Sequence, residues 1–204
     1  MTYPEFCDLT EAQAAEYLQD SKHWTLRFAV QEIIERMTGS VLDVGCGNGI
    51  EAKWYMPDRY CGCDISEPLL KAAKRYNPTH NFVWVPVDGL PFTNESFDIV
   101  FCISVMEHQH SLEAARKLFN EMVRVAKQVV IIGWHTPPWE NDTRIITKPA
   151  HFGTTGYANK YNRFDLTRDF IGSMIRHYEP EPYEIWEIIK KNVTAKLESA
   201  QAGA

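Results

Sequence analysis

The stretch Val41-Leu-Asp-Val-Gly-Cys-Gly-Asn-Gly49 decides the fold of this chain. A short apolar run ends in three glycines, Gly45, Gly47 and Gly49, and contains one acidic residue, Asp43. Short apolar runs without alternation are typical of strands buried on both faces of a parallel sheet. Glycine lets the backbone approach a ligand closely. The stretch therefore predicts a buried strand followed by a ligand-binding turn that opens a helix.

Similar runs recur along the chain and predict four more buried strands, at Tyr60–Cys63, Phe82–Val85, Asp98–Ile103 and Gln128–Gly133. Apolar residues at the spacing of a helix occur before and between the strands, at residues 10–20, 22–37, 50–55, 67–76 and 112–125. This alternation predicts an α/β fold: a doubly wound, Rossmann-like sheet, mostly parallel, with helices on both faces. Residues 89–96 leave little room for a helix between the third and fourth strands.

The end of the chain has a different pattern. Residues 166–178 are predicted as a helix, with Asp165 and Thr167 as candidate caps. Residues 185–189 and 193–198 are predicted as an antiparallel hairpin around a turn at 190–192, although 185–189 also fits a helical turn.

Composition limits the possible functions. The chain has 204 residues, is 45% hydrophobic and carries a net charge of -6, which favours one domain and disfavours general nucleic-acid binding. No apolar segment reaches membrane-spanning length, and the N-terminus lacks a basic region before an apolar one, so we expect a cytoplasmic protein. Cysteines in apolar runs, without the spacing of a zinc site, indicate reduced thiols and no metal; they are Cys46, Cys61, Cys63 and Cys102.

The spacing of the glycines narrows the choice of ligand. A dinucleotide fingerprint has Gly-x-Gly-x-x-Gly, whereas here the third glycine comes one residue early, and no Gly-Lys-Ser or Gly-Lys-Thr of a phosphate loop is present. Asp43 would repel a pyrophosphate and suits a ligand with a positive centre. Asp64 ends the second strand, where a carboxylate can accept hydrogen bonds from ribose hydroxyls. Asp88 follows the third strand and can accept from the exocyclic amine of adenine.

Four motifs resemble those of class I S-adenosylmethionine-dependent methyltransferases of the type 11 group. They are Val41–Gly49, Cys63–Leu70, Val87–Phe92 and Phe97–His108, in order and with matching spacing. The family's usual Lys-Pro-Gly-Gly turn is replaced by a shorter one, Arg124-Val-Ala-Lys-Gln128, a departure that we expect at the edge of the fold and not at the cofactor site.

The resemblance implies S-adenosylmethionine as the cofactor. Gly45 and Gly47 would pass under its methionine part, with Asp43 near the positive end and Asp64 at the ribose. The remaining cofactor-binding residues that it implies are Cys46, Ile65, Leu69, Asp88, Gly89, Leu90 and Ile103.

Transfer of a sulfonium methyl group needs alignment and exclusion of water, and a base only for some acceptors. His108 is the candidate base because it follows the fourth strand; the alternative is a packing role. Glu107 is expected to cap the next helix or support the loop. Candidate acceptor-binding residues are His135, Trp139, Tyr157, Tyr161 and Arg163, most of them in a long segment rich in aromatics. The alternatives are that His135 is only a loop residue and that the segment is a surface loop or an oligomer contact.

The predicted organisation is one methyltransferase domain over 1–204. It comprises N-terminal helices at 1–38, a cofactor-binding core at 41–133, a lid or acceptor-binding insert at 134–164, and a C-terminal helix and hairpin at 165–198. The expected acceptor is a small molecule or a glycan or lipid precursor, with no nucleic acid. The alternatives are a non-catalytic protein that binds the cofactor or S-adenosylhomocysteine, and a nicotinamide-dependent oxidoreductase.

Overall fold

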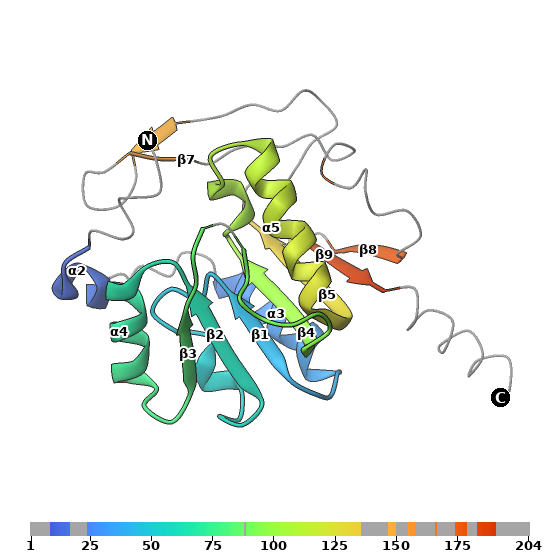
Figure 1. Ribbon diagram of the computed structural model, residues 1–204, viewed down its shortest axis with the longest axis horizontal. Helices are drawn as coiled ribbons and strands as arrows, with labels where there is room; N and C mark the ends of the chain where they lie inside the picture. The colour runs from blue at the N-terminus through green and yellow to red at the C-terminus, as the bar shows by residue number, and fades with distance from the viewer. Residues whose placement is uncertain are drawn as a thin grey trace, which may run out of the picture.

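The computed structural model describes residues 9–16, 24–87, 89–135, 147–149, 155–157, 166, 174–178 and 183–190 (Figure 1). The helices are α2 (Glu11–Glu16), α3 (Trp24–Glu35), α4 (Glu67–Tyr76) and α5 (Leu112–Val125), with 3-10 turns η1 (Ala52–Trp54) and η2 (Met106–His108). The strands are β1 (Val41–Val44), β2 (Tyr60–Asp64), β3 (Asn81–Trp84), β4 (Phe97–Ile103), β5 (Ala126–Trp134), β6 (Thr147–Pro149), β7 (Thr155–Tyr157), β8 (Met174–Tyr178) and β9 (Glu184–Ile189).

Within these ranges, seven strands form one sheet in the order β3-β2-β1-β4-β5-β9-β8. Strands β1 to β5 are mutually parallel, which confirms the predicted mostly parallel, doubly wound sheet. The chain runs outward from β1 to β3 and then returns to place β4 on the other side of β1. In such sheets a ligand binds beyond the carboxyl ends of the strands at this reversal, where the glycine loop lies.

An antiparallel C-terminal hairpin is present, and the predicted strand at 185–189 is confirmed as β9, but its partner among the described residues is β8, which precedes it in the chain. β9 pairs antiparallel with β5 on one side and with β8 on the other, so that Trp186 lies opposite both Ile132 and His177. The predicted helix over 166–178 is wrong for residues 174–178, which form β8. Every residue of β9 is buried, so its backbone groups need a partner on each edge, and this requirement outweighs local helix preference. The segment 193–198 lies outside the described residues.

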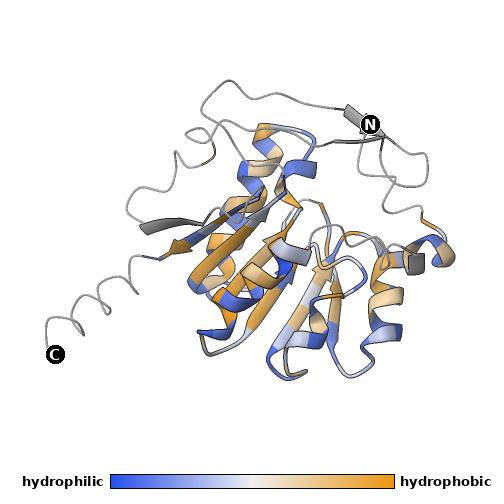
Figure 2. Cartoon of the chain, turned by 180° about the vertical axis from the view of Figure 1, so that it is seen from behind, coloured by the Kyte–Doolittle hydropathy of each residue, from blue (hydrophilic) through white to orange (hydrophobic). Residues whose placement is uncertain are grey.

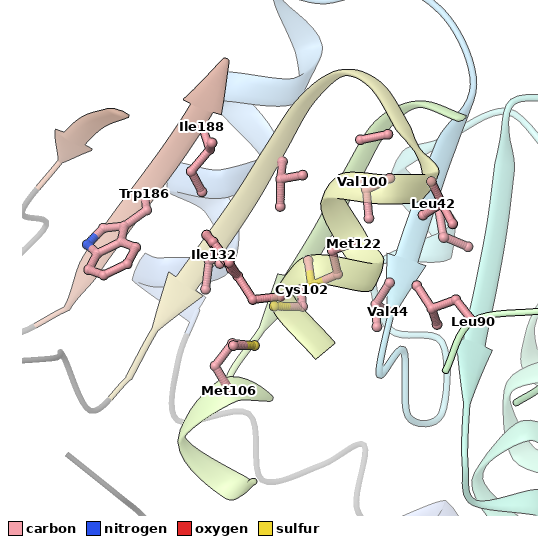
Figure 3. Packing of buried hydrophobic residues seen from close by; sticks show 14 of the residues in the cluster. Leu42, Val44, Leu90, Val100, Cys102, Met106, Met122, Ile132, Trp186 and Ile188 are labelled. Carbon is pink, nitrogen blue, oxygen red and sulfur yellow. The ribbon is translucent and has the colours of Figure 1, made fainter. Parts of the chain in front are cut away.

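Helices cover both faces of the sheet, as predicted; Figure 1 shows α5 in front of it and α3 behind. On one face, α3 buries the stripe Leu26, Val30, Ile33 and Ile34 against strand residues that include Val41, Ile99, Phe101 and Ile131. On the other face, α5 buries Ala115, Phe119, Met122 and Val125 against a cluster that includes Leu42, Val100, Cys102, Ile132 and Trp186 (Figure 3). Viewed from behind, hydrophobic residues are concentrated along the strands (Figure 2).

The predicted elements between the strands are mostly confirmed. α4 and α5 have the predicted bounds, whereas residues 50–55 contain only the 3-10 turn η1. No helix occurs between β3 and β4 in the described residues 85–87 and 89–96. β5 begins at Ala126, directly after α5, so the connection is even shorter than the sequence indicates. Among the helices described, none has the length and apolar character needed to cross a membrane.

Candidate functional site

The glycine loop after β1 folds back over the end of β2. The amides of Gly45 and Cys46 both donate to the carbonyl oxygen of Cys63, at 2.8 and 3.0 Å. Gly45, Gly47 and Gly49 have φ angles of +74°, +54° and +72°, a region that side chains disfavour. The three glycines are therefore required by the path of the backbone.

The three glycines differ in how closely other residues surround them. A Cβ atom at Gly45 would lie 2.5 Å from Cγ2 of Val105, and one at Gly49 would lie 2.9 Å from the ring of Phe82. At Gly47, apart from the glycine itself and its two chain neighbours, no atom of the described residues lies within 4 Å of the position that a Cβ would take. Gly47 thus faces open space, and its backbone can be approached closely by a ligand.

Asp64 connects the glycine loop to the start of α4. Its Oδ2 accepts the amide of Gly47 and its Oδ1 accepts the amide of Ser66, both at 2.8 Å. Burial raises the pKa of this carboxyl group, and the hydrogen bonds from the backbone oppose the rise. Because a carboxylate has about four lone-pair sites, each oxygen retains capacity for a further donor, such as a ribose hydroxyl.

Asp43 is almost completely buried within β1, 2% exposed, with Tyr60 as its neighbour. The phenol of Tyr60 donates to Oδ2 at 2.7 Å. Burial raises the pKa of Asp43 to about 7, although the Tyr60 hydrogen bond and the positive charge of Arg27 lower it. A buried carboxylate of this kind is stabilised by any additional positive charge brought close to it.

Further polar residues around the loop were not singled out by sequence reasoning. Arg27 of α3 forms an ion pair with the buried Glu51, just after the glycine loop. The side-chain amide of Asn48 donates to the carbonyl of Ala14 at 3.4 Å, which connects the loop to α2. The sequence carries only two weak signals for these contacts: Arg27 lies in a predicted helix, and Asn48 lies in the glycine loop.

The loop between β3 and β4 is held by two side chains of α5. Glu121 accepts the amide of Leu90 at 2.9 Å, and Arg124 donates to the carbonyls of Leu90 (2.9 Å) and Phe92 (2.8 Å). Arg124 also forms a two-point pair with Glu121, and this pair lowers the pKa of Glu121. We call Glu121 and Arg124 the α5 clamp. Arg124, the first residue of the 124–128 departure, holds the backbone of Leu90, a residue that the resemblance assigns to the adenine; whether the departure touches the cofactor site stays a prediction.

The other predicted cofactor residues lie on several different elements. Asp88 lies outside the described residues, and Gly89 has a φ of +154° beside Glu121. The carbonyl of Ile65 accepts the indole N–H of Trp84 at 2.9 Å. Three are buried: Cys46 in the loop beside Gly62, Ile103 at the end of β4, and Leu69 against Ala14 of α2. Contact with a cofactor stays a prediction for each.

The candidate base and its neighbours follow β4 and β5. His108 ends η2, and its ring centroid lies 6.1 Å from that of His135, with the planes 30° apart. Glu107 accepts the backbone amide of His135 at 2.9 Å and its Nδ1 at 3.0 Å. Glu107 does not cap α5, because Ser111 does so through the amide of Ala114. Sequence reasoning missed the Glu107–His135 pair, since nothing in the spacing of 28 residues signals it.

The predicted acceptor-binding residues are described only in part. Tyr157 ends β7, which pairs antiparallel with β6 and packs against η2, the turn that carries His108. Trp139, Tyr161 and Arg163 lie outside the described residues, as do most residues of the 134–164 segment.

In the described part of the chain, no cluster of three or more His, Cys, Asp or Glu residues could hold a metal ion. Cys46, Cys61, Cys63 and Cys102 are buried free thiols, and burial raises the pKa of each.

Comparison with known proteins agrees with this geometry. Residues 42–132 match the family Methyltransf_11, described as a methyltransferase domain. The chain is therefore similar to methyltransferases over the range that contains the glycine loop, Asp64 and His108.

Individual relatives differ in what they act on. The tRNA (carboxymethyluridine(34)-5-O)-methyltransferase of Saccharomyces cerevisiae is 30% identical over 128 residues, covering 60% of this chain and 45% of the relative. The phthiotriol/phenolphthiotriol dimycocerosates methyltransferase of Mycobacterium tuberculosis is 33% identical over 93 residues, 43% of this chain and 33% of the relative. The chain spans less than half the length of either.

A solved structure has a similar fold over most of this chain. The sugar N-methyltransferase KedS8 from Streptoalloteichus has a TM-score of 0.67 at 14% identity, and the match covers 86% of this chain and 91% of KedS8.

Proposed function

We propose that this protein transfers the methyl group of S-adenosylmethionine to an acceptor by in-line displacement. The observation that carries the proposal is the open space in front of Gly47, directly beside the Asp64 carboxylate at the reversal of the sheet. The residues around it fit the cofactor: Asp64 has capacity for ribose hydroxyls, and Asp43 is a buried carboxyl group that a positive ligand would stabilise.

Methyl transfer requires little of the protein beyond positioning the methyl donor and the acceptor. S-adenosylmethionine supplies an activated methyl group, and the protein aligns it with the acceptor and excludes water. In this proposal Gly45 and Gly47 lie under the methionine part, and Asp64 orients the ribose. The α5 clamp fixes the backbone of Leu90, which together with Asp88 borders the adenine.

The acceptor that we favour is a small molecule or a glycan or lipid precursor. The net charge of -6 gives no broad positive surface for a phosphate backbone. A lipid methyltransferase and a sugar N-methyltransferase are among the proteins to which the chain is similar.

A second candidate acceptor is tRNA. It is supported by the 30% identity over 128 residues to the yeast tRNA methyltransferase. The two candidates are distinguished by incubating the protein with tritiated S-adenosylmethionine and either a small-molecule extract or total tRNA. Label in the first fraction supports our proposal, whereas label in tRNA alone would replace it. Binding without any transfer would favour the non-catalytic alternative.

Cofactor binding is tested by calorimetric titration with S-adenosylmethionine, S-adenosylhomocysteine and NAD. The informative variant is Asp64→Asn, and the matched control is Asp98→Asn. Asp98 also holds a backbone amide, that of Ser40 at 2.8 Å, but it does so at the opposite end of the sheet. We expect both adenosyl ligands to bind, NAD not to bind, and only Asp64→Asn to weaken binding, by roughly 10-fold or more. Tight NAD binding, or equal effects of the two variants, would refute the assignment.

A further inference from the structure

Glu107 and His135 form a side-chain pair that the proposed cofactor site does not use. Glu107 lies in η2, just beyond β4, and His135 directly follows β5. The two strands are adjacent and parallel, so both residues lie at the carboxyl edge of the sheet, the edge that carries the glycine loop. The pair is therefore positioned on the ligand side of the fold.

The geometry of the pair fixes the histidine ring. One oxygen of Glu107, Oε1, accepts both the backbone amide of His135 and its Nδ1. The Glu107 side chain is fully buried, whereas that of His135 is 25% exposed. Two contacts from one buried oxygen hold the backbone and the ring of His135 in a single arrangement.

Glu107 remains a carboxylate despite its burial. Burial by itself would raise its pKa, but the hydrogen bond from His135 and the nearby rings of His108 and His135 hold the pKa below its usual range. An ionised carboxylate can only accept hydrogen bonds, so Nδ1 of His135 must carry the proton. In the neutral ring, Nε2 then has the lone pair.

We propose that His135, oriented by Glu107, is the residue that accepts the proton of the methyl acceptor, in place of His108. This inference rests on the proposed methyltransferase function. As an acceptor oxygen or nitrogen forms its bond to the methyl carbon, the carbon–sulfur bond breaks and its electron pair stays on sulfur as S-adenosylhomocysteine. The proton of the acceptor moves to Nε2 of His135, and the resulting imidazolium is stabilised by the Glu107 carboxylate.

In this proposal His108 is not the base. Its ring lies 6.1 Å from that of His135, and it adds to the field that keeps Glu107 ionised. We assign the role of base to His135 because a carboxylate at 3.0 Å sets its tautomer. Glu107 is a positioning residue, since it acts through His135.

The first test determines the tautomer of His135 and needs no ligand. Long-range nitrogen–proton spectra of the histidine-labelled full chain should show protonated Nδ1 and unprotonated Nε2 for neutral His135. Glu107→Gln should weaken this preference, because a neutral amide can also donate to the ring, and His108→Asn should weaken it less, because the hydrogen bond between Glu107 and His135 remains. A His135 ring protonated at Nε2 in the wild-type protein would overturn the proposal.

The second test measures transfer. The probes are tritiated S-adenosylmethionine with either the small-molecule extract or total tRNA. We expect His135→Gln to lower kcat by about 10²–10⁴-fold and Glu107→Gln by about 10–100-fold, with little change in KM for S-adenosylmethionine. Calorimetry with S-adenosylhomocysteine checks that both variants still fold and bind. Full turnover in His135→Gln would overturn the inference, whereas a wild-type protein that binds no adenosyl ligand would overturn the proposed function instead.

Discussion

Asp43 makes the unliganded fold sensitive to pH. Its pKa is about 7 in the folded protein, against 3.8 for an ordinary aspartate, with burial as the main cause. Between these values the unfolded chain has released the proton while the folded chain retains it. The free energy of unfolding should therefore fall as the pH rises from about 4 to about 7 and then level off.

Asp43→Asn should remove this dependence. An amide oxygen can still accept from Tyr60, and no charge is buried, so we expect the variant to be more stable than wild type by on the order of 2–4 kcal/mol at pH 8. The difference should shrink toward pH 4, as measured by urea unfolding across the range. The same variant should bind S-adenosylmethionine about 10-fold more weakly, because the stabilising negative charge is lost. A variant that is less stable at pH 8 would contradict this account.

Gly45 and Gly47 should respond differently to alanine. At Gly45 the new methyl group collides with Val105, so we expect a loss of about 2–4 kcal/mol of unfolding free energy. At Gly47 there is room, and only the positive φ should cost stability, about 1 kcal/mol. Gly47→Ala should instead reduce S-adenosylhomocysteine affinity. Unfolding curves and calorimetry on the two variants compare these effects, and unchanged affinity in Gly47→Ala would show that the ligand lies elsewhere.

The sequence identified these residues more readily than their roles. Acidic residues at strand ends and positive-φ glycines leave a local signature, so Asp43, Gly47 and Asp64 could be proposed from their spacing. The hydrogen bond from the Gly47 amide to Asp64 and the pairing of Glu107 with His135 join segments that are distant in the sequence. No local pattern encodes such contacts.

Among the elements, the α5 clamp couples a helix to the loop that follows β3. Arg124→Lys keeps the charge but cannot reproduce the planar fork that binds Leu90, Phe92 and Glu121. We expect unfolding free energy to fall by about 1–2 kcal/mol and S-adenosylhomocysteine to bind roughly 10-fold more weakly. The control is Lys127→Gln, which removes an exposed ion pair with Asp98 and should change either quantity little. Equal effects of both variants on binding would argue against a role for the clamp.

The sequence predicts some of the helices and strands but not others. Strands β1 to β5 could be predicted because burial on both faces leaves continuous apolar runs, and α4 and α5 because their spacing is periodic. β8 could not, since Met174-Ile-Arg-His-Tyr178 has no strong strand pattern and becomes a strand by pairing with β9. The sequence therefore predicts a hairpin between 185–189 and 193–198, whereas the described structure pairs β9 with the segment that precedes it.

For the whole molecule, ligand binding should raise thermal stability. A ligand at 100 times its Kd adds about 2.7 kcal/mol to the folded state, which corresponds to a rise in Tm of roughly 5–10 °C for a chain of this size. We expect this shift with S-adenosylhomocysteine and none with NAD in calorimetric scans. The predicted single-domain organisation over 1–204 would give one cooperative transition that moves as a unit, whereas two transitions, of which only one moves, would contradict it.

The reactivity of the buried Cys46 thiol can be used to measure opening of the glycine loop. It is packed beside Gly62 and its pKa is raised by burial, so it should resist alkylating reagents while the loop is closed. Modification then requires a transient local opening, and its rate measures how often that opening occurs. Followed by mass spectrometry with and without S-adenosylhomocysteine, this single sulfur atom would report how strongly the ligand restrains the backbone around it.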